Sequence, residues 1–190
     1  MLIGDNAQES SLYSSSILSL SKPCSVFPSL PQSEKILAAY GDSHEGVLRF
    51  AGDGKFHLHT ETFYREFLAE NKNVYRYLFD ARNPFVPKAG SHHGVELLYL
   101  FGGFEMGERQ EKVGSEMRKA WVRFVVGEAV WEKGAEEKVL LFTDEEVRVV
   151  EKEEVGRRRN ERGWKELEEL GWEKVAPVVS EVVKGRIRFE

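Results

Sequence analysis

Two adjacent histidines, His92 and His93, stand in the stretch GSHHGVELLYLFGG, between glycines and directly before an apolar segment. A loop histidine is most often solvated or bonded to a nearby backbone group, so its position alone favours a non-catalytic role. The imidazole of a histidine can act as a general base when a carboxylate binds Nδ1–H and Nε2 faces the reacting group. Chemistry at this loop therefore requires a carboxylate partner from elsewhere in the chain.

Glu9 is a candidate for that carboxylate by its place in the order of elements, although its residue type and position alone favour an exposed carboxylate at a helix N-terminus. It follows the apolar run MLIG, which is typical of a strand leading into a loop, and it precedes His93 by 84 residues. His93 follows residues 73–81, NVYRYLFDA, whose aromatic and β-branched side chains predict a largely buried strand. In α/β-hydrolases the triad members follow the chain order Ser, Asp or Glu, then His, on loops after strands. Glu9 and His93 fit the last two places in that order.

Three segments resemble the type B carboxylesterases, the family that includes the cholinesterases. The stretch HGVELLYLFG, residues 93–102, is similar to the family's catalytic-histidine block, in which His-Gly-x-Glu precedes apolar residues and Phe-Gly. The stretch MLIGDNAQESSLY is similar to its acid block, Gly-x-Asn-x-Asp-Glu-Gly after a strand. The stretch SEMRKAWVRFVVGEAVW is similar to the helix that follows the histidine. The resemblance covers residues 1–131, whereas residues 132–190 are divergent and highly charged.

The resemblance implies a role for each of four residues. His93 falls on the catalytic histidine and Glu9 on the triad acid, while His92 is a neighbour without a proton-transfer role. Glu96 has two interpretations. It is either a buried carboxylate that supports the triad or a solvent-facing side chain at the start of a short helix.

The chain also departs from the family pattern. Gln8-Glu9-Ser10 stands in place of Asp-Glu-Gly, and Glu132-Lys133 follows Trp131 where the family has Pro and an aromatic residue. The nucleophile elbow Gly-x-Ser-x-Gly does not occur anywhere in the sequence. Its nearest imitation, GDSHEG at residues 41–46, has the second glycine one place too late, and we predict a loop there. We therefore expect a serine ester hydrolase that lacks its nucleophile and is inactive as this isolated chain.

The alternation of helices and buried strands predicts an α/β fold with an incomplete sheet. The resemblance implies that residues 1–190 are the C-terminal part of an α/β-hydrolase domain, with the last sheet strands and their helices. Strands are predicted at MLIG, 73–81, 139–143 and 147–151. Helices are predicted at 8–20, 33–40, 60–73 and 107–126, with a charged helical tail from 151 to 171, and loops at 21–32 and 82–94.

Several functional classes are disfavoured. The net charge of −5 does not indicate a nucleic-acid protein, and the basic stretch at residues 156–164 has acidic flanks. No apolar run is long enough to span a bilayer, and MLIGDNAQES lacks the features of a signal peptide.

His57 and His59, expected on one face of a strand, lack a third metal ligand, and Cys24 has no second cysteine to pair with. We predict no metal and no cofactor. The predicted partner is a small-molecule ester bound by the complete enzyme, and the compartment stays undecided.

Two other interpretations remain open. The chain could be a non-catalytic, hydrolase-derived interaction module, although that lineage would not need to keep both the acid and the histidine. It could also be a truncated reading frame of a longer enzyme, which the start at the strand MLIG favours. A folded monomer would support the module, and aggregation through unpaired strand edges would support the fragment.

Overall fold

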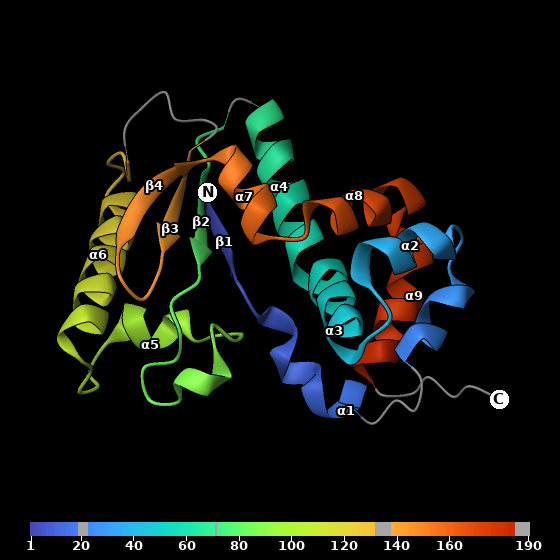
Figure 1. Cartoon of the computed structure of the whole chain (residues 1–190). Coiled ribbons are helices and arrows are strands. Elements are labelled where there is room, and N and C mark those ends of the chain that lie inside the picture. Colours follow the sequence, from blue (N-terminus) through green and yellow to red (C-terminus); the bar gives the residue numbers. More distant parts are fainter. Residues whose placement is uncertain (19–22, 71, 132–137, 185–190) are drawn as a thin grey trace. The chain divides into compact units, whose positions relative to one another are not determined.

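The computed structural model describes residues 1–18, 23–70, 72–131 and 138–184, which divide into two compact units (Figure 1). The first unit comprises Met1–Glu9 and Thr62–Arg158, and the second comprises Ser10–Glu61 and Arg159–Glu190.

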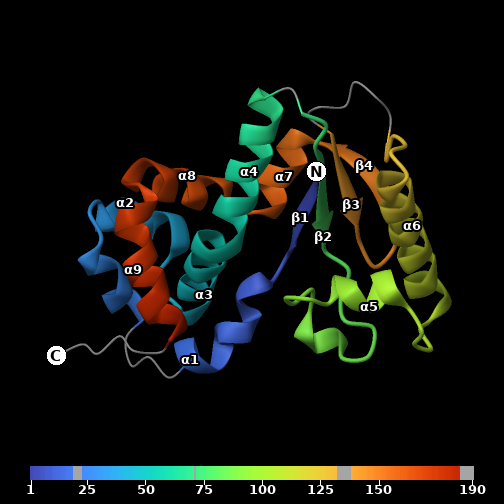
Figure 2. The same ribbon diagram turned by 180° about the vertical axis from the view of Figure 1, so that it is seen from behind.

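The first unit contains a four-stranded mixed sheet. Its strands are β1 (Leu2–Asn6), β2 (Tyr75–Phe79), β3 (Lys138–Phe142) and β4 (Val147–Glu151). They lie side by side in this order (Figures 1 and 2). The pairs β1–β2 and β2–β3 are parallel, whereas β4 runs antiparallel to β3 as a hairpin. All four predicted strands are thus confirmed, and the chain leaves β1 and β2 at the same edge of the sheet.

Two helices pack on one face of this sheet. They are α5 (Glu96–Phe101) and α6 (Glu108–Val125), and α6 matches the helix predicted at 107–126. The side chains of α6 that recur at helical spacing are buried, because they meet the aromatic residues of β2 and β3. The shared apolar core includes Phe79, Tyr99, Val113, Met117, Leu140 and Phe142.

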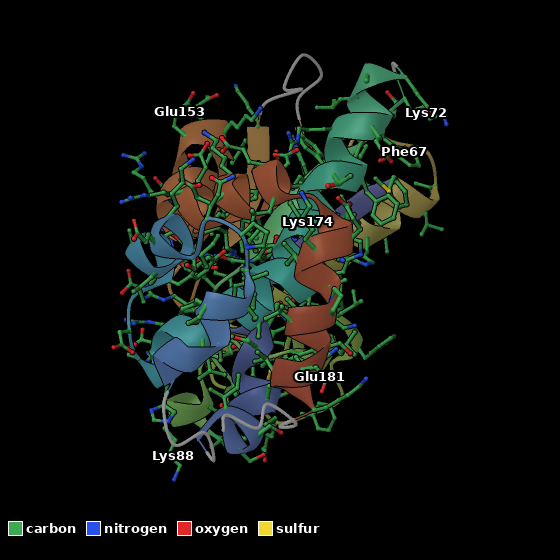
Figure 3. All side chains as sticks on the ribbon, turned by 90° about the vertical axis from the view of Figure 1, so that its right-hand side faces the viewer. Phe67, Lys72, Lys88, Glu153, Lys174 and Glu181 are labelled. Carbon is green, nitrogen blue, oxygen red and sulfur yellow. The ribbon has the colours of Figure 1, made fainter. Side chains whose placement is uncertain are left out.

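Two further α-helices contribute to the first unit. Helix α7 (Lys152–Arg158) follows β4, and Arg158 binds Asp80 at the end of β2 through Nη1 at 2.8 Å. Helix α4 (Leu58–Ala69) contributes residues to both units. Just beyond its C-terminal end, Nζ of Lys72 lies 4.9 Å from the centroid of the Phe67 ring, a cation–π contact. Both residues are labelled in Figure 3.

The described part of the second unit is helical. Its α-helices are α1 (Ser14–Leu18), α2 (Ser33–Tyr40), α3 (His44–Gly52), α8 (Glu161–Leu170) and α9 (Trp172–Val183), together with part of α4. Shorter helical segments are the 3-10 helices η1 (Glu9–Tyr13) and η2 (Pro23–Ser29) and the π-helix η3 (Asp53–His57). The 3-10 helix η4 (Pro87–Ala89) belongs instead to the first unit. Edge-to-face contacts join the Phe50 ring to those of Phe27 and Tyr40, with centroids 5.4 and 5.6 Å apart, and anchor the core of this unit.

Two predicted loops were wrong in part. Of the loop predicted at 21–32, residues 21 and 22 lie outside the described residues, residues 23–29 form the 3-10 helix η2, and residues 30–32 are irregular as predicted. Residues 41–46 include the start of α3, because the Ser43 side chain accepts a hydrogen bond from the Gly46 N–H at 3.0 Å and caps that helix.

Two further predictions failed in the helical unit. The strand expected for His57 and His59 is helical, since η3 ends at His57 and α4 begins at Leu58. The helical tail does not end at Gly171, because α9 follows it and buries the apolar stripe of Val175, Val179 and Val182.

In the described residues, no helix combines the length and apolar character required to cross a bilayer.

Candidate active site

The structure brings Glu9 and His93 together. Oε2 of Glu9 lies 2.6 Å from Nδ1 of His93, although 84 residues separate them in the chain. A carboxylate can only accept here, so Nδ1 carries the proton and donates it. Nε2 is then the nitrogen with a lone pair that can take up a proton. The Glu9 side chain is only 8% exposed and that of His93 is 54% exposed, so the acid is buried behind an accessible imidazole.

Glu9 and His93 come together because they follow the ends of two neighbouring strands. Asn6 and Phe79 are paired at the ends of parallel strands β1 and β2, so the chain leaves both strands at one edge. The Ala7 N–H then donates to the Phe79 carbonyl at 3.0 Å, and the Gln8 N–H donates to the Ser91 carbonyl at 2.9 Å. These bonds continue the sheet pairing by a few residues, which places Glu9 opposite His93.

Gly90 allows the histidine loop to approach Gln8 closely. Its backbone has φ 65° and ψ −157°, a region that is almost restricted to glycine. A Cβ at this position would lie 1.5 Å from Oε1 of Gln8. The Gly90 carbonyl also accepts from the Asn83 N–H at 3.0 Å, which closes the loop that precedes the two histidines in the chain.

The environment of Glu9 opposes its ionisation. Burial raises the pKa of Glu9 above its ordinary value, and the nearby carboxylate of Asp5 adds to this increase. The hydrogen bonds from the Asn6 N–H and from His93 act in the opposite direction, because they stabilise the charged carboxylate. The acid is therefore held in a site where its charge depends on these two donors.

His92 is engaged through both ring nitrogens. Nε2 lies 2.9 Å from the Asn83 amide nitrogen, which must donate, and Nδ1 lies 2.9 Å from the His93 carbonyl, which must accept. One neutral tautomer, with the proton on Nδ1, satisfies both contacts. Both ring nitrogens of His92 are thus engaged by its own loop, and its lack of a role in proton transfer stays a prediction.

Glu96 is half-buried at the first position of α5 and binds Asn6. Its Oε2 accepts a hydrogen bond from the Asn6 side-chain amide. Glu96 is therefore neither fully buried nor fully exposed to solvent, the two environments predicted for it, and its carboxylate binds Asn6 at the end of β1.

Sequence reasoning did not assign a role to Asn6. Asn6 is 1% exposed, and its N–H donates to Oε1 of Glu9 at 2.8 Å. Its amide nitrogen also donates to the His92 carbonyl at 3.0 Å. The signal that could have found it is the asparagine in the acid block of the resemblance, two residues after Gly4.

The other histidine pair occupies different surroundings. His57 is buried in the second unit, with Nδ1 2.6 Å from Oδ1 of Asp53, one turn earlier on η3. His59 instead stacks edge-to-face on Trp172, with ring centroids 4.5 Å apart. A helical backbone turns these two histidines to different sides, so they cannot share a metal as they could on a strand. Among the described residues, no group of three or more His, Cys, Asp or Glu side chains could hold a metal ion.

Comparison with solved structures places the fold among the esterases. The chain superposes on a PNB esterase structure with a TM-score of 0.60 and 19% sequence identity, over 84% of this chain and 37% of that one. At this identity the likeness shows the fold alone. The four-stranded sheet and its helices thus correspond to part of an α/β esterase fold.

Sequence comparison identifies the family. The carboxylesterase family model matches residues 32–161, which include His93 and Glu96. Lipase 1 of Yarrowia lipolytica is 30% identical over 119 residues, covering 63% of this chain. The chain belongs to the carboxylesterase family. It spans 24% of the length of Lipase 1 and 37% of the PNB esterase chain, so it corresponds to part of these relatives.

Proposed function

We propose that this chain supplies the acid and the general base of a serine carboxylesterase, with Glu9 and His93 in these roles. The observation that carries the proposal is the 2.6 Å contact between Oε2 of Glu9 and Nδ1 of His93. Burial of the acid and exposure of the imidazole are what proton transfer to an external group requires. The family gives the reaction type, which is hydrolysis of a carboxylic ester.

In this mechanism His93 moves one proton in each half-reaction. A serine Oγ attacks the ester carbonyl while Nε2 of His93 accepts the Oγ proton. The imidazolium then gives this proton to the departing alcohol oxygen, which leaves an acyl-serine. Water attacks the acyl group with His93 again accepting a proton, and the carboxylic acid is released as the serine recovers its proton. Throughout, Glu9 holds Nδ1–H and stabilises the imidazolium.

We further propose that the nucleophilic serine comes from outside these 190 residues. The sequence has no Gly-x-Ser-x-Gly elbow, and Ser43 of the nearest imitation uses its Oγ to cap α3. Ser91, close to the histidine in sequence, is 2% exposed and donates its Oγ proton to the Phe79 carbonyl at 2.6 Å. Loss of the nucleophile costs about a million-fold in turnover in a serine hydrolase triad, so the isolated chain should be inactive.

An ester assay on the purified chain tests the absence of the nucleophile. A p-nitrophenyl ester series is incubated with the wild-type chain and with His93→Ala under identical conditions. We expect the two rates to be equal and close to that of buffer. Turnover that His93→Ala abolishes would show that the chain contains its own nucleophile and would overturn this part of the proposal.

The paired acid and base are tested separately by nitrogen NMR of the imidazoles. In mildly alkaline buffer, wild-type His93 should be in the Nδ1–H tautomer, because Glu9 accepts that proton. Glu9→Gln should weaken this preference, since a side-chain amide can also donate and accommodate the other tautomer. A wild-type ring in the Nε2–H tautomer would contradict the proposed roles of both residues.

A further inference from the structure

Asn6 makes three donor contacts where β1 ends. Its backbone N–H binds Oε1 of Glu9 at 2.8 Å. Its side-chain nitrogen donates to the His92 carbonyl at 3.0 Å and to Oε2 of Glu96. A primary amide nitrogen has two hydrogens, so each of these side-chain acceptors can receive one of them. One buried residue is therefore bonded both to the acid and to the peptide group that immediately precedes His93.

We infer that Asn6 is a positioning residue that fixes the distance between Glu9 and His93, an inference that rests on the proposed function. Glu9 begins a short 3-10 helix three residues after Asn6, whereas His93 belongs to a loop 87 positions further along the chain. The Asn6 main chain fixes the carboxylate, and the Asn6 side chain fixes the histidine loop. Both ends of the Glu9–His93 bond are thus tied to the same residue.

The exposure of His93 explains why such a tie is needed. Its side chain is 54% exposed, so packing holds only part of the ring. Gly94, directly after it, has φ 77° and brings no side chain that could support the ring. The position of the imidazole therefore depends on its bond to Glu9 and on the polar contacts that hold its backbone neighbours. A misplacement of about 1 Å at a reacting group can cost a hundred-fold in rate, so a fixed loop matters for this chemistry.

The side chain at position 6 must donate hydrogen bonds to its two partners, and an acceptor there would not fit. The His92 carbonyl and the Glu96 carboxylate both accept hydrogen bonds, so they fix the amide with its nitrogen toward them. Glu96 in turn acts through Asn6, because its carboxylate holds the amide in this orientation. Asp has the same size as Asn, but it would direct a carboxylate oxygen at two acceptors, and this contact is repulsive.

The test is a charge-swap series read by nitrogen NMR of the His93 ring. The variants are Asn6→Asp, Glu96→Gln and the double variant, with the wild type as reference. The signal of His93 is assigned by its loss in His93→Ala. Asn73→Asp is the matched control, because Asn73 is exposed and the change in charge and size is identical.

Asn6→Asp should lower the ratio of the Nδ1–H to the Nε2–H tautomer of His93 about tenfold, since two donor bonds are replaced by repulsion. Asn73→Asp should leave the ratio unchanged. Glu96→Gln alone should have little effect, because the amide oxygen can still accept from Asn6. The double variant exchanges the two groups, so the amide at position 96 can donate to the carboxylate at position 6. The ratio should therefore recover at least in part.

Each outcome separates the inference from the function on which it rests. A wild-type ring in the Nε2–H tautomer would contradict the Glu9–His93 pairing itself. A wild-type Nδ1–H ring that Asn6→Asp leaves unchanged, in a folded protein, would overturn the role of Asn6 and leave the pairing intact. If Asn6→Asp does not fold, Asn6→Ala is measured instead, because it removes the amide and keeps the backbone bond to Glu9. An unchanged ratio in that variant would equally overturn the inference.

Discussion

Replacement of Glu9 by Gln and by Ala should have very different effects on stability. The two oxygens of Glu9 serve different donors, with Oε1 bound to the buried Asn6 N–H and Oε2 bound to His93. Gln keeps an oxygen for the Asn6 N–H, whereas Ala leaves that donor without this acceptor. A buried donor without an acceptor costs about 1–3 kcal/mol. The half-exposed His93 ring can exchange its lost bond for one to water, so it adds little.

We therefore expect Glu9→Ala to lower the free energy of unfolding by about 1–3 kcal/mol at neutral pH, and Glu9→Gln to change it by less than about 1 kcal/mol. Urea unfolding followed by circular dichroism measures both values. Equal losses in the two variants would refute the assignment of the Asn6 bond as the main structural contribution of this carboxylate.

The pH dependence of the free energy of unfolding gives a second test, in which the wild type is compared with Glu9→Gln. Because burial raises the pKa of Glu9, the folded protein binds a proton more readily than the unfolded chain does. Between the unfolded value of about 4.3 and the higher folded value, wild-type stability should therefore fall as pH rises, relative to Glu9→Gln. If the stability of the wild type relative to Glu9→Gln instead rises with pH across this range, the bonds from Asn6 and His93 must lower the pKa of Glu9 more than burial raises it.

Three further substitutions test other parts of the fold. Gly90→Ala should cost about 1–3 kcal/mol in thermal unfolding because of its backbone angles, whereas Gly107→Ala, at φ −65°, should be nearly neutral. Asp53→Ala should cost about 2–3 kcal/mol in urea unfolding, since it removes the 2.6 Å partner of buried His57; no loss would show that this pair is dispensable. Tyr99→Phe should cost about 1 kcal/mol in the same assay, because the hydroxyl donates to a backbone carbonyl at 2.6 Å, and an unchanged midpoint would contradict this.

The parts of the fold that the sequence predicts are those with a strong local pattern. The dense aromatic and β-branched run of β2 and the apolar stripe of α6 each fix one element without help from distant residues. The failures arise where local signals are ambiguous or contradictory. The alternation in His57-Leu58-His59 suggests a strand, yet the surrounding helices extend through it. Gly171 and Pro177 suggest that the helical tail has ended, yet the buried valines of α9 hold it in place.

The candidate site was predictable only in part, for a related reason. The order Glu9 then His93 could be read along the chain, because each residue follows a predicted strand. The contacts of Asn6 could not, because they join groups 86 and 90 residues apart and depend on how far parallel pairing extends beyond β1 and β2. A single buried amide has no periodicity, so only the folded backbone shows which acceptors it meets.

The most direct test of the central claim is to capture the native protein from its source and label it with a fluorophosphonate, which reacts with activated serines. Capture uses an antibody against a peptide of this chain, and mass spectrometry then gives the intact mass and the labelled residue. We predict a mass well above the 21.8 kDa of these 190 residues and a label on a serine outside them. A native protein of 21.8 kDa that carries no label would contradict the esterase role and favour a non-catalytic interaction module.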